Sequence, residues 1–125
     1  MSDTGKITWT DLTIENAEEV RDFYSNVTGW TSKALSMGDC DDYCMNDAEG
    51  TTVAGICHAR GPNANIPPMW LIYINVDDLD ASTAKCVELG GEVLEAPRSV
   101  GDGRMAVIRD PAGAVAGLYQ KNASD

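Results

Sequence analysis

Residues 7–14 and 70–76 are predicted to be β-strands: the first has a mixed pattern of apolar and polar side chains, and in the second Ile72, Ile74 and Val76 form an apolar face with a period of two. Each stretch is followed by apolar residues at intervals of three and four, the spacing of one side of a helix. Asn16 and Asp78 occupy the N-cap positions, and the second helix should run to about Leu89. Each half of the chain is therefore predicted to begin with a strand and a helix.

The first of these helices carries two further predictions. Glu19 lies three residues after Asn16, the spacing of a capping box, and Gly29 should end the helix. One apolar stripe runs along the helix and should lie in the core; it consists of Ala17, Val20, Phe23, Tyr24 and Val27.

Three short strands should follow each helix, because apolar or alternating runs are separated there by turn-forming residues. In the first half these runs are Trp30–Met37, Tyr43–Asn46 and Thr51–His58, with a turn at residues 38–42. In the second half they are Glu92–Ala96, Arg104–Arg109 and Ala114–Gln120, with a tight turn at residues 101–103.

The second half of the chain repeats the first. Residues 53–56 align with residues 115–118 at an offset of 62 residues, and each segment follows an Asp-x-x-Gly turn, at Asp47 or Asp110. The first copy has one extra residue near Thr51. We therefore interpret residues 1–125 as a single domain made of module one (6–58), a connector (59–68) and module two (69–120).

Composition and charge narrow the class of protein. The chain has 125 residues, of which 43 % are hydrophobic, which is enough for the core of one domain. A net charge of −11 would repel a phosphate backbone, so nucleic acid is excluded as a partner. The polar start of the chain, with four cysteines and no membrane-length apolar run, predicts a cytoplasmic protein with reduced thiols and no membrane partner.

Several short motifs resemble those of the vicinal oxygen chelate superfamily, which includes glyoxalase I, the bleomycin-resistance proteins and the extradiol dioxygenases. They are residues 16–24, Gly29-Trp30, Val76–Asp80, Gly90-Gly91 and Asp110–Gly113. Residues 9–12, 70–74 and 117–120 are most similar to its glyoxalase-like branch. The resemblance implies an α+β fold in which two tandem β-α-β-β-β modules form a cup-shaped mixed sheet with helices outside. It also implies a homodimer, in which a partner chain completes exposed strand edges.

The same resemblance implies where a metal would bind. Metal-dependent members place His or Glu ligands on the first and fourth strand of each module, and the internal repeat carries those positions onto Trp9, Gly55, Leu71 and Gly117. None of these side chains can ligate a divalent cation. We therefore expect no metal and no cofactor, which counts against the metal-dependent activities of the superfamily.

The expected function is a metal-free pocket for a small amphipathic organic molecule. An even number of residues separates each proposed ligand-binding residue from a cup-facing position on its strand; these residues are Trp9, Asp11, Tyr73, Asn75 and Tyr119. Gly55 and Gly117 should leave the floor of the pocket open. Aromatic residues on strands are also common as plain packing.

Two other functions stay open. One is an enzyme of the same superfamily, of lyase or dioxygenase type, with a displaced or non-standard catalytic site. The other is a structural subunit whose cup is filled by its own side chains. Whether the chain is an enzyme is thus undecided.

A few side chains could carry chemistry. Asp11 is a weak candidate for a general acid or base, or else a structural carboxylate. Cys57 corresponds to Tyr119 in the repeat and should face the cup. Cys40 and Cys44 should be unbonded thiols. His58, an odd step from Gly55, should lie on the opposite face as a solvent-facing or connector residue, with a place at the pocket rim as the alternative.

Overall fold

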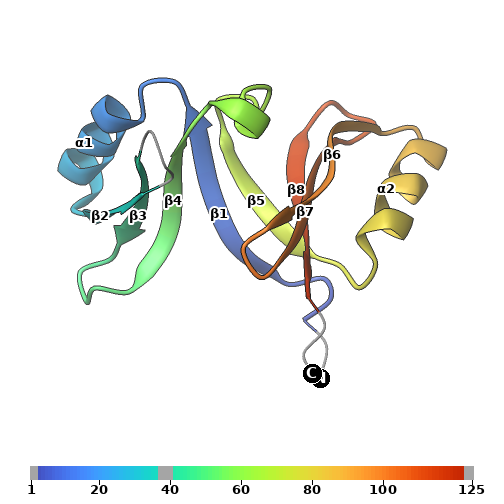
Figure 1. Cartoon of the computed structure of the whole chain (residues 1–125), viewed down its shortest axis with the longest axis horizontal. Coiled ribbons are helices and arrows are strands. Elements are labelled where there is room, and N and C mark those ends of the chain that lie inside the picture. Colours follow the sequence, from blue (N-terminus) through green and yellow to red (C-terminus); the bar gives the residue numbers. More distant parts are fainter. Residues whose placement is uncertain (1–2, 37–40, 123–125) are drawn as a thin grey trace. The chain divides into compact units, whose positions relative to one another are not determined.

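The computed structural model describes residues 3–36 and 41–122, and within these ranges the chain runs twice through the order strand, helix and three strands (Figure 1). The first half contains β1 (Ile7–Ile14), α1 (Ala17–Thr28), β2 (Thr31–Ser36), β3 (Asp41–Asn46) and β4 (Thr52–His58). The short 3₁₀ helix η1 (Gly61–Asn63) lies in the connector. The second half contains β5 (Trp70–Asn75), α2 (Leu79–Glu88), β6 (Glu92–Val100), β7 (Gly103–Arg109) and β8 (Val115–Lys121). The predicted α+β class and the duplicated β-α-β-β-β order are confirmed.

The chain divides into two compact units. Unit 1 comprises Met1–Thr8 and Leu71–Asp125, and unit 2 comprises Trp9–Trp70. In unit 2 the strands lie in the order β2-β3-β4-β1, with β1 parallel to β4 and the other neighbours antiparallel. In unit 1 the order is β5-β8-β7-β6, with β5 parallel to β8 and the other neighbours antiparallel. The two units therefore share one topology.

The internal repeat is visible in the pairing of the strands themselves. Asp11 on β1 lies opposite Gly55 on β4, and Tyr73 on β5 lies opposite Gly117 on β8. Both members of the second pair lie 62 residues after those of the first, which is the offset that the sequence alignment predicts. Homologous positions thus occupy homologous places in each unit.

The two Asp-x-x-Gly turns have the same hydrogen bonds. Oδ1 of Asp47 and Oδ1 of Asp110 each accept the backbone N–H groups two and four residues further along the chain, at 2.8 to 3.0 Å. Gly50 and Gly113 adopt φ angles of 84° and 94°, a left-handed conformation that other residues rarely adopt. These local interactions explain why the turn signal is readable from the sequence.

The extra residue of the first copy forms a β-bulge. Asn46 and Met45 are consecutive on β3, yet they pair with Thr52 and Ala54 on β4. Val53 is left between them without a partner across the ladder, as in other bulges with one inserted residue. The insertion thus lies at Val53, two positions after the place that the sequence indicates.

In unit 2 the core lies between α1 and one face of the sheet. Its buried residues are Leu12, Ile14, Ala17, Tyr43, Met45, Ala54 and Ile56, and Val20, Tyr24, Trp30 and Trp70 pack against them. The prediction that the whole stripe of α1 is buried is wrong for Phe23 and Val27, which are 57 % and 65 % exposed. At about 100° per residue Phe23 lies about 120° around the helix from Ala17, whereas Val27 points close to the direction of Val20 and is exposed in the last turn of α1.

The helix ends agree with the sequence except at Asn16. Asp78 caps α2, since its Oδ1 accepts the N–H of Ala81 at 3.1 Å, and Gly29 ends α1 with a φ of 83°. The capping-box prediction is wrong, because the Asn16 side chain makes no cap hydrogen bond and instead donates to Oε2 of Glu19 at 3.2 Å.

The edge of unit 1 shows where local signals fall short. β6 continues to Val100, beyond the predicted end at Ala96, although it contains Pro97. β6 is the last strand in the order of unit 1 and its register shifts twice along β7, so the missing N–H of proline is tolerated. None of the helices in the described part of the chain has the length and hydropathy of a membrane-spanning segment.

We predict that deleting Val53 is tolerated, because the deletion converts the bulge into the regular pairing that β7 and β8 already have. The free energy of unfolding in urea should change by no more than about 1 kcal/mol. Deleting Ala116 from the regular ladder is the matched control; it moves the following residues of β8 to the other face and should cost several-fold more or prevent folding. Equal losses for both deletions would contradict the assignment of the bulge.

Candidate functional site

The face of the unit 2 sheet that turns away from α1 carries an aromatic and acidic pair. A Cβ placed on Gly55 would lie 3.1 Å from Cζ2 of Trp9 and 3.4 Å from Cβ of Asp11, so both side chains lie beside this glycine. Nε1–H of Trp9 donates to Oδ2 of Asp11 at 3.2 Å. The indole is 37 % exposed. This face therefore presents an apolar ring and a carboxylate next to each other, as a site for an amphipathic molecule requires.

The homologous face of unit 1 is filled by its own side chains. A Cβ on Gly117 would lie 2.4 Å from Cδ2 and Cε2 of Tyr73, so the tyrosine ring lies directly on the glycine. Tyr73 is buried. On the neighbouring strand, a Cβ on Gly103 would lie 2.5 Å from the hydroxyl oxygen of Tyr119. Rings of the chain itself thus occupy the space that these glycines leave.

The side chain of Asn75 binds the start of the chain. Its Nδ2 donates to the carbonyl oxygen of Lys6 at 3.1 Å and to Oγ1 of Thr8 at 2.6 Å. The backbone supports the same contact, because the N–H of Gly5 donates to the carbonyl of Asn75. Asn75 is buried and holds the first residues of β1 within unit 1.

These placements separate the predicted ligand-binding residues. Trp9 and Asp11 belong to unit 2, whereas Tyr73, Asn75 and Tyr119 belong to unit 1. Their convergence on one surface stays a prediction. A ligand on either face would meet aromatic rings before it reached the glycines, which differs from the open floor that the sequence suggested.

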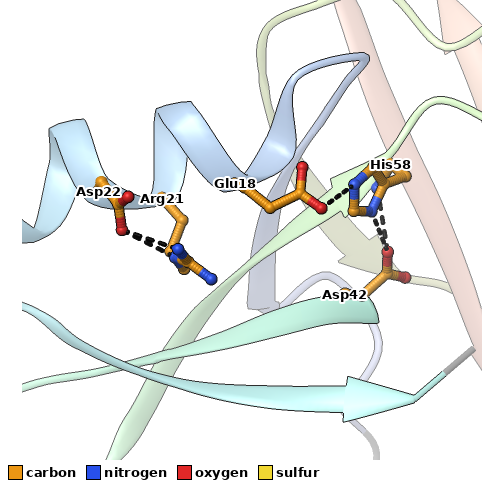
Figure 2. A network of polar contacts seen from close by, with 5 residues as sticks. All are labelled: Glu18, Arg21, Asp22, Asp42 and His58. Atoms are coloured by element: carbon orange, nitrogen blue, oxygen red, sulfur yellow. Dashed lines mark hydrogen bonds and ion pairs between the residues drawn. The ribbon is translucent and has the colours of Figure 1, made fainter. Parts of the chain in front are cut away.

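The structure places His58 differently from the prediction that it faces solvent. The residue is 2 % exposed, because the first turn of α1 lies over the end of β4. Figure 2 shows its ring between two carboxylates, with Nε2 3.1 Å from Oε2 of Glu18 and Nδ1 3.7 Å from Oδ1 of Asp42. The same Asp42 oxygen accepts the backbone N–H of His58 at 3.0 Å. His58 does lie on the face of β4 opposite to Gly55, as predicted, but α1 covers that face.

This polar network, made of Glu18, Asp42 and His58, connects α1 to the sheet of unit 2. The pKa of the Glu18 carboxyl is lowered by a hydrogen bond from its own backbone N–H and then by the His58 imidazole. The two carboxylates lie on opposite nitrogens of the ring, so they do not converge on a common point. In residues 3–36 and 41–122, no group of three or more His, Cys, Asp or Glu side chains is arranged to hold a metal ion.

The thiol of Cys57 offers little nucleophilic chemistry. Burial raises the pKa of the Cys57 thiol well above its usual range, and the carboxylates of Asp11 and Asp42 raise it further. A thiol that stays protonated at neutral pH is a weak nucleophile. Cys44 and Cys57 are free thiols. The prediction that Cys40 is also unbonded concerns a residue outside the described part of the chain.

Glu18 and Asp42 are polar residues that sequence reasoning did not select. Glu18 looked like an ordinary acidic residue in the first turn of a helix, and Asp42 like part of an acidic turn. The single histidine was a signal that could have led to them. Using it requires knowing that the end of β4 lies under the first turn of α1, which depends on the tertiary fold.

Comparison with known proteins is consistent with this architecture. Residues 6–116 match the family model of the Glyoxalase/Bleomycin resistance protein/Dioxygenase superfamily. The chain therefore belongs to this superfamily, in agreement with the resemblance seen in its motifs.

Among its relatives is "Putative glyoxylase CFP32" of Mycobacterium tuberculosis, which is 37 % identical over 121 residues, covering 94 % of this chain and 46 % of the relative. Another is "Anthracycline biosynthesis protein DnrV" of Streptomyces peucetius, which is 33 % identical over 130 residues, covering 94 % of this chain and 47 % of the relative. The chain thus spans about half the length of the curated relatives it matches.

Solved structures share the fold at low sequence identity. A hypothetical protein, BH1468, from Bacillus halodurans C-125 superposes with a TM-score of 0.61 at 14 % identity and covers 97 % of each chain. Methylmalonyl-CoA epimerase from Streptomyces coelicolor superposes with a TM-score of 0.57 at 16 % identity, covering 98 % of this chain and 100 % of the epimerase. At these identities the likeness concerns the fold alone.

We predict that Glu18→Gln destabilises the protein at pH 7 but not in acid. Because the folded-state pKa of Glu18 lies below its ordinary value of 4.5, its stabilising contribution is present above that value and is lost as the pH falls through the folded-state pKa. Urea midpoints of wild type and variant should therefore converge between pH 7 and pH 3. Glu19→Gln, which removes a carboxylate from the same helical turn but not from the network, is the control. Identical behaviour of the two variants would attribute the effect to the helix dipole and not to His58.

Proposed function

We propose that this chain binds a small amphipathic organic molecule through the face of unit 2 that carries Trp9 and Asp11, without a metal ion. The observation that carries the proposal is the exposed indole of Trp9 hydrogen-bonded to the Asp11 carboxylate beside Gly55. A flat apolar group can stack on the indole, while the carboxylate accepts a hydrogen bond or attracts a positive charge.

The absence of a metal from the proposed mechanism follows from the donor chemistry. The resemblance and the internal repeat carry the metal-ligand positions of the superfamily onto Trp9, Gly55, Leu71 and Gly117, which offer carbon or indole groups. Tyr73 covers Gly117, and the edge of the Trp9 ring lies against Gly55. Aromatic rings in place of ligating oxygens and nitrogens favour stacking as the main source of affinity.

The class of ligand is a planar, multi-ring compound with an amine or hydroxyl group at one end. Two relatives carry the name anthracycline biosynthesis protein, which supports a polycyclic aromatic ligand. The net charge of −11 and the carboxylate of Asp11 support a ligand that is neutral or positively charged.

A reducing compartment, the cytoplasm, is the proposed location, supported by the free thiols of Cys44, Cys57 and Cys86.

The alternative is an enzyme of the same superfamily, of lyase or dioxygenase type, with a displaced catalytic site. Asp11 is the residue that favours it, because a half-buried carboxylate next to an indole is suited to proton transfer. Stoichiometric zinc, nickel or iron held by side chains in the purified protein would favour this alternative over metal-free binding.

We predict that Trp9→Ala weakens the affinity for an anthracycline by about tenfold or more, because stacking on a large ring is worth roughly 1–3 kcal/mol. Asp11→Asn should weaken binding of an amine-bearing anthracycline but leave that of an uncharged hydroxyanthraquinone nearly unchanged, because only the former carries a positive charge. Quenching of the ligand's own fluorescence gives both dissociation constants.

Phe23→Ala is the control for this experiment, because Phe23 is an exposed aromatic residue on α1, away from the Trp9 and Asp11 face. If Phe23→Ala weakens binding as much as Trp9→Ala does, the ligand does not occupy the proposed face. If neither Trp9→Ala nor Phe23→Ala changes the affinity, the proposal is also refuted.

We also propose a homodimer. Within the described residues, β2 pairs on one side with β3 and all its side chains are exposed, which leaves an edge that a second chain can extend. Sedimentation at micromolar concentration should give about twice the chain mass of 13.4 kDa. Replacing a residue of β2 whose N–H points away from β3 by proline should lower that mass toward the monomer, since such a proline removes a donor from the open edge. A mass of 13.4 kDa for the wild type would refute the dimer.

A further inference from the structure

A hollow of about 580 Å³ lies within unit 1, between α2 and the sheet beneath it. The sheet side is formed by the apolar residues Val76, Ile108 and Leu118, and the helix side includes Ala81 and Leu89. The hollow is wide open to solvent, so a bound molecule would stay partly exposed. The hollow lies on the face of the unit 1 sheet that α2 covers, whereas the face that carries Tyr73 and Gly117 points the other way.

The hollow exists because α2 rests on the sheet through one side only. Leu79 and Thr83 are the buried residues of this helix, and Leu79 packs in the core with Ala106 and Leu118. Ala81, Ser82, Lys85 and Cys86 of the helix line the hollow. Leu89, just after the helix end, is 67 % exposed at the rim, so an apolar group entering the hollow would remove this side chain from water.

The charges around the hollow favour a positive ligand group. Asp77 and Asp78 line the corner between β5 and α2. Oδ1 of Asp78 accepts the N–H of Ala81, and Oδ1 of Asp77 accepts the hydroxyl of Thr4, so both of these donors are neutral groups. Lys85 also lines the hollow, but its Nζ lies 3.5 Å from a carboxylate oxygen of Glu88, which offsets its charge.

We propose that this hollow is a second binding site, for a small organic amine whose apolar body lies on Val76, Ile108 and Leu118 and whose ammonium group lies against Asp78. The shape supplies an apolar surface for the body, and the acidic corner sets the sign of the charged end. This inference concerns residues of unit 1 and does not rest on the Trp9 face.

The test uses three probes with one apolar body and different ends: 4-phenylbutylamine, 4-phenylbutanol and 4-phenylbutyrate. Titrations followed by NMR should give saturable shifts at Val76, Ile108 and Leu118. The amine should bind about threefold more tightly than the alcohol, as expected for a solvent-accessible ion pair, and the carboxylate should bind most weakly. Added salt should reduce the difference between amine and alcohol.

Two variants separate the charge from the apolar surface. Asp78→Asn removes the charge but keeps a good N-cap residue, so the amine should lose its advantage over the alcohol while the helix persists. Leu89→Ala should weaken all three probes by about tenfold, since one apolar side chain at the rim is removed. Val87→Ala is the matched control, because Val87 is an exposed apolar residue of α2 that does not line the hollow.

The expected set of results also includes unchanged binding in Trp9→Ala, which separates this site from the proposed face of unit 2. Saturable shifts confined to residues around Trp9 would overturn the inference. The inference would also be overturned if the three probes bound with equal affinity and Asp78→Asn did not change these affinities. It would be overturned as well if no probe bound saturably to the folded wild-type protein.

Discussion

Each unit depends on a parallel pair of strands in which a glycine lies beneath an aromatic ring. In unit 1 the Tyr73 ring lies so close to Gly117 that a single added methyl group would overlap it at 2.4 Å, and in unit 2 the Trp9 ring touches the corresponding position at Gly55. Parallel pairing joins the first strand of each repeat to its last strand, β1 to β4 and β5 to β8. The contact between ring and glycine therefore holds together segments that are far apart in the sequence. The close approach of the Tyr73 ring requires a glycine at position 117, whereas at Gly55 a small shift of the Trp9 ring would make room for a side chain.

Features set by neighbouring residues could be predicted from the sequence. The turns at Asp47 and Asp110, the cap at Asp78 and the end of α1 at Gly29 each depend on residues within five positions, and all four are present as expected. Burial depends on which side of an element meets another element. Phe23 has the spacing of a core residue but lies on the wrong flank of α1, and His58 has the position of a connector residue but lies under that helix. Neither outcome is fixed by local periodicity.

The candidate site shows the same division. Strand alternation correctly groups Trp9 and Asp11 beside Gly55, and Tyr73 beside Gly117. It does not reveal what each side chain does there, because that depends on contacts across strands and with distant segments. Asn75, selected as a ligand-binding residue, uses its amide nitrogen to hold Lys6 and Thr8, some 67 to 69 residues away in sequence.

The duplication also explains why stacking on the glycine-bearing face of the sheet is proposed for unit 2 and not for unit 1. At homologous places, 62 residues apart, unit 2 has Asp11 and Cys57 where unit 1 has Tyr73 and Tyr119. In unit 1 the rings of Tyr73 and Tyr119 lie over Gly117 and Gly103. This packing stabilises the sheet but occupies the face on which a ligand could bind. In unit 2 the smaller, polar side chains leave the indole of Trp9 partly exposed beside a carboxylate. Two copies of one motif have therefore diverged, so that one face is closed by packing and the other keeps the groups that a ligand can use.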